Sequence, residues 1–336
     1  MELKPNIYYK TILQYREAEL LFEALKLDIF SYLDEPTTLE EFLKSTNYDK
    51  ENTKYFLSAL LSCGYIEKNN LTYCNTKCSK LYLSKNSSKY IGKAILFREK
   101  LGSISNIGDK VKDNSLGQND KLDFSELAEI VHDEMYVTGR VDDFNREIKQ
   151  LFSDKYRNYK VLDLGGGSGV LSIEFIRNFP NSTACVFETS EVACISKKII
   201  EKNDMQDKIF VLEGDFNVDA IGDGYDLIIA SGIFNFVNMD ITEFICKLSD
   251  ALVLNGHLLI IGSFFENEEY HKEHILNWLK GYINGMKPAP KKSEIEQSMR
   301  KANLSLEKRI KVGLFVGELR RKDGEIWSWH LYKMKL

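Results

Sequence analysis

The feature that most constrains this chain of 336 residues is a glycine cluster directly after a short apolar run. Residues 161–170 read VLDLGGGSGV. Glycine allows the backbone to turn tightly and to approach a ligand closely, and a helix that begins there presents unpaired N–H groups at its N-terminus. The segment is therefore typical of a strand–loop–helix unit that binds a ligand at the loop.

The sequence around the cluster alternates between strands and helices. Short apolar segments at 160–165, 183–188, 208–214, 225–231 and 257–265 are separated by helical patterns, including one around 241–254. Continuous apolar strands alternating with helices predict a parallel sheet that is covered on both faces. Residues 304–315 and 326–335 add two strands, which we expect to form an antiparallel hairpin at one edge. The fold class is α/β, with a mostly parallel seven-stranded sheet.

The first 100 residues predict a different, mainly α, domain. Helical spacing runs over 11–34, Thr38-Leu39-Glu40-Glu41 has the pattern of a capping box, and another helix near 51–62 ends before Gly64. A hairpin with its turn at Asn69-Asn70 follows. Three helices and a hairpin in this order predict a winged helix.

Charge argues against a nucleic-acid function for this winged helix. Residues 1–100 contain 15 Lys and Arg against 13 Asp and Glu, and the whole chain has a net charge of −5. Phosphate neutralisation needs several basic side chains on one face, whereas the third helix offers only Lys50 and Lys54. A packing or dimerisation role is the better interpretation.

The remaining composition predicts a soluble, cytoplasmic chain. No apolar run approaches the roughly 18 residues of a membrane span, and the N-terminus lacks the core of a signal peptide. The six cysteines are scattered, and Cys74 and Cys78 are the only close pair. Without a second pair or clustered histidines we expect reduced thiols and no metal site.

Residues 101–155 are interpreted as connector helices between the two domains. The polar stretch 107–123 predicts an exposed loop, and helical patterning resumes over 124–152. The predicted domains are therefore a winged helix over 1–100, a connector over 101–155 and a ligand-binding domain over 156–336.

Two further strand ends carry candidate ligand contacts. Glu188 ends the second strand, where a carboxylate can accept two hydrogen bonds from a ribose diol. The third strand ends at Gly214-Asp215-Phe216, which can bond and stack on an adenine. A dinucleotide fingerprint would need glycine in place of Val170, and no lysine follows the glycines as a phosphate loop requires.

The spacing D-x-G-x-G-x-G from Asp163 to Gly169 resembles motif I of class I S-adenosylmethionine-dependent methyltransferases. With the Gly-Asp-Phe triplet and the domain order, nearly the whole chain resembles the O-methyltransferase family of caffeate, hydroxyindole and polyketide-tailoring enzymes. That resemblance implies a homodimer, a small-molecule methyl acceptor bound between domains, and S-adenosylmethionine as cofactor. The residues it implies in cofactor binding are Asp163, Gly165, Gly166, Gly167, Glu188 at the ribose, Asp215 and Phe216 at the adenine, and Ser231.

One position departs from the family pattern. Many members have a histidine base shortly after the fourth strand, where our alignment places Asn235, and asparagine cannot act as a base near neutral pH. Alignment of donor and acceptor then supplies the catalysis, with Asn235 orienting the acceptor. Two connector residues remain open alternatives, His132 as a base next to Asp133, and Arg140 as a contact for an anionic acceptor.

The predicted function is methyl transfer to an apolar or aromatic small molecule, most simply at oxygen. Methylation of sulfur, nitrogen or carbon stays open because of Asn235, as does a relative that has lost methylation. From another class, a winged-helix regulator that senses the cofactor stays open, although the weak basic face disfavours it.

Overall fold

The computed structural model describes residues 5–105, 107–113, 124–262, 272–312 and 315–323. The chain divides into two compact units, residues 1–100 and residues 101–336, and helix α5 (Gly92–Gly102) contains the boundary. Within the described ranges, no helix combines the length and the apolar character needed to cross a membrane.

The first unit has a small antiparallel sheet in the strand order β1-β3-β2, accompanied by helices. Its elements are α1 (Asn6–Lys26), the 3-10 helix η1 (Ile29–Leu33), β1 (Thr37–Thr38), α2 (Leu39–Thr46), α3 (Lys50–Ser62), β2 (Ile66–Asn69), β3 (Thr72–Asn75) and α4 (Lys77–Tyr82). The order is that of a winged helix. The predicted capping box at Thr38 is confirmed, because Thr38 and Glu41 exchange hydrogen bonds between side chain and main chain.

The prediction of one helix over 11–34 is wrong, because the chain turns at Asp28. Asp28 has a left-handed conformation with φ +56°, which a short polar side chain with local hydrogen bonds tolerates. Its carboxylate accepts a hydrogen bond from Ser31 Oγ over 2.6 Å and pairs with Lys85 Nζ at 3.3 Å. These contacts end α1 and start η1 in a new direction.

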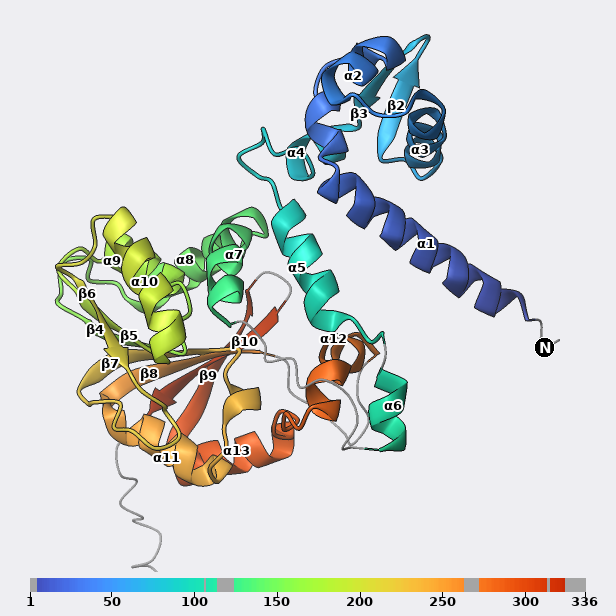
Figure 1. The fold of residues 1–336 in the computed structure, drawn as a ribbon. Coiled ribbons are helices and arrows are strands. Elements are labelled where there is room, and N and C mark those ends of the chain that lie inside the picture. Colours follow the sequence, from blue (N-terminus) through green and yellow to red (C-terminus); the bar gives the residue numbers. More distant parts are fainter. Residues whose placement is uncertain (1–4, 106, 114–123, 263–271, 313–314, 324–336) are drawn as a thin grey trace, which may run out of the picture. The chain divides into compact units, whose positions relative to one another are not determined.

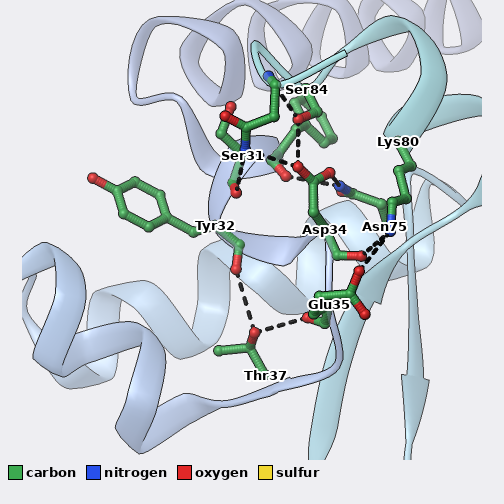
Figure 2. A network of polar contacts seen from close by, with 10 residues as sticks. Ser31, Tyr32, Asp34, Glu35, Thr37, Asn75, Lys80 and Ser84 are labelled. Carbon is green, nitrogen blue, oxygen red and sulfur yellow. Dashed lines mark hydrogen bonds and ion pairs between the residues drawn. The ribbon is translucent and has the colours of Figure 1, made fainter.

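A polar network around Asp34 holds η1 to the hairpin and to α4 (Figure 2). The Asp34 carboxylate accepts hydrogen bonds from Asn75 Nδ2 over 3.1 Å and from Ser84 Oγ over 2.8 Å. Lys80 Nζ donates to the Asp34 carbonyl over 2.6 Å, and Asn75 also donates to the Phe30 carbonyl over 2.7 Å. Because the donors come from β3, from α4 and from the segment after α4, the network connects these parts of the first unit to η1.

The second unit contains one seven-stranded sheet in the order β6-β5-β4-β7-β8-β10-β9 (Figure 1). Its strands are β4 (Lys160–Leu164), β5 (Thr183–Glu188), β6 (Ile209–Glu213), β7 (Tyr225–Ser231), β8 (Leu252–Gly262), β9 (Leu304–Val312) and β10 (Phe315–Lys322). The first five strands in the order are parallel, and β10 is antiparallel to both β8 and β9. The predicted α/β fold is confirmed.

Helices cover both faces of this sheet (Figure 1). The helices that the structure describes in this unit are α6 (Ile107–Lys112), α7 (Phe124–Val137), α8 (Arg140–Leu151), α9 (Val170–Asn178), α10 (Ser190–Lys202), the 3-10 helix η2 (Phe234–Phe236), α11 (Ile241–Ala251), α12 (Lys272–Ile283) and α13 (Lys292–Lys301). One core packs side chains of α8, α9 and α10 on the sheet, and the other packs α11 and α13. The strand order reverses between β4 and β7, the position at which open α/β sheets bind ligands.

The structure confirms an antiparallel hairpin at one edge of the sheet, but the second strand of this hairpin consists of other residues than predicted. The structure places that strand at Phe315–Lys322, whereas the predicted segment 326–335 lies outside the described residues. The sequence of β10 does not resemble that of a buried strand, because it contains charged residues. Arg320 is one of them, and it is only 2% exposed. Its guanidinium is buried in ion pairs with Glu318 on the same strand and with Glu296 of α13, the latter at 2.9 Å.

Two other boundaries differ from the prediction. The expected loop over 107–123 begins with α6, and Lys110 Nζ of this helix donates to Asn284 Oδ1 over 2.6 Å; residues 114–123 lie outside the described part. Strand β8 begins at Leu252, earlier than the predicted 257, so that α11 ends at Ala251.

Candidate active site

The glycine cluster joins the end of β4 to the start of α9 at the carboxyl edge of the sheet. Gly165, Gly167 and Gly169 have φ values of +62°, +57° and +73°, a region that other residues rarely adopt. A Cβ atom on Gly165 would lie 2.5 Å from Cγ2 of Ile233, in the segment after β7. Conformation and close approach therefore both require glycine at residue 165.

Asp163 lies on β4 next to this loop and is almost fully buried, with 1% of its surface exposed. Ser172 Oγ donates a hydrogen bond to Asp163 Oδ2 over 3.0 Å, whereas Oδ1 finds no partner in the part of the chain that the structure describes. Burial raises the pKa of Asp163 to about 7. A Cβ atom on Gly166 would lie 2.6 Å from Asp163 Cγ, so this glycine leaves room for the carboxyl group.

Glu188 ends β5, the strand next to β4, and its carboxylate reaches the glycine loop. Its Oε1 accepts a hydrogen bond from the Gly167 N–H over 2.8 Å, and its Oε2 accepts one from the Thr189 N–H over 3.0 Å. Burial raises the pKa of Glu188, although both N–H groups favour the ionised form. Because a carboxylate has about four acceptor positions, two remain for a ligand.

Asp215 and Phe216 follow β6, the strand that pairs with β5. Asp215 is exposed, and its Oδ1 accepts hydrogen bonds from the main chain and the side chain of Asn217 over 2.9 and 2.8 Å. Phe216 is half-buried and packs on Phe244 of α11, with 5.6 Å between the ring centroids. Asp215 therefore stabilises its own turn, and its Oδ2 is the oxygen that this turn does not use.

Ser231 and Asn235 lie beyond the carboxyl end of β7. Ser231 is the last residue of the strand, Asn235 is the middle residue of η2, and both side chains are half-buried. No other side chain among the described residues engages the Asn235 amide. The amide is therefore available to a ligand.

Helix α7 lies along the rim of these loops and contacts them through residues spaced four apart. The residues on this face are Phe124, Ala128, His132 and Tyr136. Phe124 packs edge-on against Phe236 of η2, with ring centroids 5.3 Å apart. Ala128 is buried beside the glycine loop, since a Cβ atom on Gly167 would lie 3.8 Å from the Ala128 Cβ.

The second half of this face continues from the glycine loop to α9. His132 Nδ1 lies 3.3 Å from Ser168 Oγ, and burial lowers the pKa of His132 below its usual value. The Tyr136 hydroxyl donates to Glu174 Oε1 of α9 over 2.9 Å. A hollow of about 520 Å³ between α7, α9 and α10 is lined in part by His132, Arg177 and Lys202.

The structure brings part of the predicted set together at the glycine loop and places Asp215, Phe216, Ser231 and Asn235 after the neighbouring strands β6 and β7. Asp163, the glycines, Glu188 and His132 meet around a single loop. Arg140 begins α8 beyond the turn at Gly139, so it does not share the face of α7 that lies on this loop.

Sequence reasoning missed the serines that hold the loop. Ser168 contacts His132, Ser172 contacts Asp163, and Ser196 of α10 donates to the Gly167 carbonyl. Ser168 lies inside the glycine motif, and this position could have marked it as a residue of the site. Ser172 and Ser196 occur on helices whose sequence gives no reason to single them out.

This arrangement, a glycine turn and an acidic strand end at the point where strand order reverses, defines a class I methyltransferase fold. Residues 147–283 match the family model described as the O-methyltransferase domain. An uncharacterised protein of Methanocaldococcus jannaschii is 29% identical over 294 residues, which are 85% of this chain and 74% of that protein.

Solved structures share the fold over nearly the whole chain. A putative O-methyltransferase from Nostoc punctiforme has a TM-score of 0.79 at 15% identity, covering 96% of this chain and all of the other (100%). Human N-acetylserotonin methyltransferase, solved in complex with SAM, has a TM-score of 0.69 at 18% identity and covers 96% and 100%. The match to the O-methyltransferase domain covers residues 147–283 of the second unit, and this family match points to a methyltransferase that uses S-adenosylmethionine.

Proposed function

We propose that this chain methylates an oxygen atom of a small apolar or aromatic acceptor. The observation that carries the proposal is the contact between Glu188 and Gly167, which joins an acidic strand end to a glycine turn in one cradle. The open amide of Asn235 at the end of the neighbouring strand β7 supplies a polar group for the acceptor.

The residues around the loop fit S-adenosylmethionine. Glu188 keeps two acceptor positions, as a ribose diol requires, and the buried Asp163 Oδ1 lacks a partner among the described residues. When bound, this cofactor supplies an electrophilic methyl group on a sulfonium sulfur. We assign the loop glycines to its methionine part, Glu188 to its ribose, Asp215 and Phe216 to its adenine, and Ser231 to the wall of the pocket.

At the proposed acceptor site, Asn235 occupies the position where many members of the family have a histidine base. Asn235 can donate or accept a hydrogen bond but cannot remove a proton near neutral pH. Catalysis then rests on orientation and on exclusion of water, which can contribute several kcal/mol (about 7 or more in well-oriented reactions). The acceptor that suits this site is one that ionises readily in water, such as an acidic phenol or an enol.

Methylation of another atom is the second candidate, and Asn235 is the observation that favours it. A thiolate or an activated carbon needs no base beside it, so an amide would serve equally well there. Identifying the atom that receives the methyl group therefore distinguishes the two candidate functions.

The test is a methyl-transfer screen with S-adenosylmethionine over matched phenols, enols, thiols and amines, with the demethylated cofactor as readout. The proposal expects turnover with phenols or enols that rises as the acceptor pKa falls. Turnover confined to thiols, amines or carbon acceptors would refute transfer to oxygen. A fall in turnover of about tenfold on Asn235→Ala, with cofactor affinity retained, would support a role of Asn235 at the acceptor.

We also propose that the chain is a cytoplasmic homodimer assembled through α1. The first half of this helix leaves apolar side chains in water, including Tyr8 and Tyr9 at 72% and 70% exposure, and such patches mark association surfaces. All six cysteines are unpaired, as a reducing compartment would leave them. Sedimentation should show a dimer that Tyr8→Glu with Leu13→Glu converts to a monomer; an unchanged mass for this double variant would refute the assignment.

A further inference from the structure

We propose that His132 is a positioning residue, which fixes the glycine loop through Ser168 so that cofactor affinity depends on helix α7. The proposal rests on the function proposed above and assigns His132 a role other than that of a base. Its basis is the contact of 3.3 Å between His132 Nδ1 and Ser168 Oγ.

The composition of the loop makes Ser168 its only side chain that another element can hold. Residues 165–169 read Gly-Gly-Gly-Ser-Gly. The serine is 3% exposed, so its hydroxyl is hidden from water and needs a partner within the protein. His132 provides it from the helix that covers the loop.

Flexibility of the backbone explains why such a contact should matter. Glycines lose more conformational freedom on ordering than other residues, and a ligand that binds an ordered loop avoids part of that entropy loss. The main chain of the loop is already held at Gly165, which donates to the Phe187 carbonyl over 2.9 Å, and at Gly167 by Glu188. Between Gly167 and Gly169, which have positive φ values, His132 adds the side-chain contact.

The surroundings of His132 favour a neutral, fixed imidazole. Burial lowers the pKa of His132; the charges of Asp133 and Glu174 oppose this shift, whereas those of Lys202 and Arg177 add to it. The ring also packs edge-on against Tyr136, with centroids 5.5 Å apart. A neutral ring held at Nδ1 by a buried serine is suited to holding a loop.

The other contacts of α7 extend the effect beyond the loop. The same face packs Phe124 on Phe236 of η2, next to Asn235, and binds Tyr136 to Glu174 of α9. One rigid helix therefore spans from the acceptor segment to the cofactor loop. A change at His132 should alter cofactor binding first and leave the chemical step nearly unchanged.

The test is isothermal titration of the full chain with S-adenosylhomocysteine, the demethylated cofactor. His132→Ala and Ser168→Ala should each weaken binding about three- to tenfold, the range expected for one neutral hydrogen bond. The double variant should be no weaker than the worse single one, because both remove the same contact. Asp133→Asn is the matched control next to His132, and it should bind as the wild type does.

His132→Asn separates positioning from acid–base chemistry. Its amide lies at about the position of Nδ1 and can bond Ser168, but it cannot exchange a proton near neutral pH. Affinity within about twofold of wild type, with turnover at saturating cofactor retained and the same pH profile, is expected. If His132→Asn loses turnover as His132→Ala does while affinity is unchanged in both, the residue is a base and the proposal is wrong.

The same titrations keep this inference apart from the proposed function. Failure of the wild-type chain to bind the demethylated cofactor would overturn the function itself. Wild-type binding together with additive losses in the double variant, or no loss in either single variant, would overturn only the role of His132.

Discussion

The main-chain N–H of Gly167 donates a hydrogen bond to Glu188 Oε1 over 2.8 Å. The loop after β4 is therefore held by a side chain from the end of β5, and two adjacent strand ends act as one unit. Because the carboxylate uses two of its acceptor positions on N–H groups, its remaining positions are directed by the protein before a ligand arrives.

Gly165→Ala should destabilise the protein more than an alanine at an open glycine does. Both Gly165 and Gly139 have positive φ, but a Cβ on Gly165 would lie 2.5 Å from Ile233, whereas a Cβ on Gly139 would meet nothing within 4 Å. Gly139→Ala should cost about 1 kcal/mol from backbone strain alone, and Gly165→Ala about 2–4 kcal/mol because the contact adds overpacking. Urea unfolding of both variants measures this difference, and equal losses would show that Ile233 moves aside freely.

Asp163 should make the ligand-free chain less stable as the pH rises. Its folded-state pKa of about 7 exceeds the usual 3.8, so the native state holds a proton that the unfolded state releases. Stability from this group is complete below the usual pKa and is lost as the pH rises through the folded value. Unfolding free energy should thus fall by about 2–4 kcal/mol between pH 4 and 8.

Asp163→Asn should remove this component of the pH dependence, and urea titrations at several pH values follow it. Ser172→Ala is the matched control, because it deletes the hydrogen bond that favours the ionised carboxylate. It should steepen the decline. Parallel curves for wild type and Asp163→Asn would contradict a protonated Asp163.

Glu174 should contribute more to stability than its partner Tyr136. The Glu174 side chain is 8% exposed and accepts hydrogen bonds from Tyr136, Asn145 and Arg177. Burial alone would raise its pKa, but these donors together lower it. Glu174→Ala removes three hydrogen bonds whose donors are partly exposed to water and should cost about 2 kcal/mol, whereas Tyr136→Phe should cost about 1 kcal/mol or less. Chemical denaturation tests the order, and a larger loss for Tyr136→Phe would reverse this assignment.

Asn235 should affect the acceptor and not the cofactor. Asn235→Ala removes one orienting hydrogen bond, so kcat should fall about tenfold while cofactor affinity stays within about twofold. The pH profile of the variant should keep the shape set by ionisation of the acceptor, because asparagine has no proton to exchange. Steady-state kinetics with a phenol identified in the screen checks this. A new inflection in the pH profile would show that another group serves as base.

Much of the sheet could be predicted because its strands carry a local signal. β5 and β7 occupy the predicted residues, since each is an apolar segment bounded by polar turns. β10 escaped prediction because its burial depends on a long-range ion pair between Arg320 and Glu296. The break at Asp28 escaped for a similar reason, as its left-handed conformation is stabilised by Lys85, distant in sequence.

In the site, too, the residues that adjoin an apolar strand could be predicted, whereas contacts between residues far apart in sequence could not. The glycine turn and Glu188 are visible in sequence because each follows an apolar strand directly. The contact between His132 and Ser168 joins residues 36 positions apart, and nothing in either neighbourhood indicates it. The half-buried position of Asn235 agrees with its predicted place after the fourth parallel strand, while its role stays a prediction.

The most direct measurement is titration of the wild-type chain and of Glu188→Ala and Glu188→Gln with S-adenosylmethionine. Wild type should bind one equivalent per chain with micromolar affinity. Glu188→Ala should abolish measurable binding, and Glu188→Gln should weaken it about tenfold or more, because an amide replaces two charge-assisted acceptor positions. Saturable binding that is equal in all three proteins, or none in the folded wild type, would contradict the account.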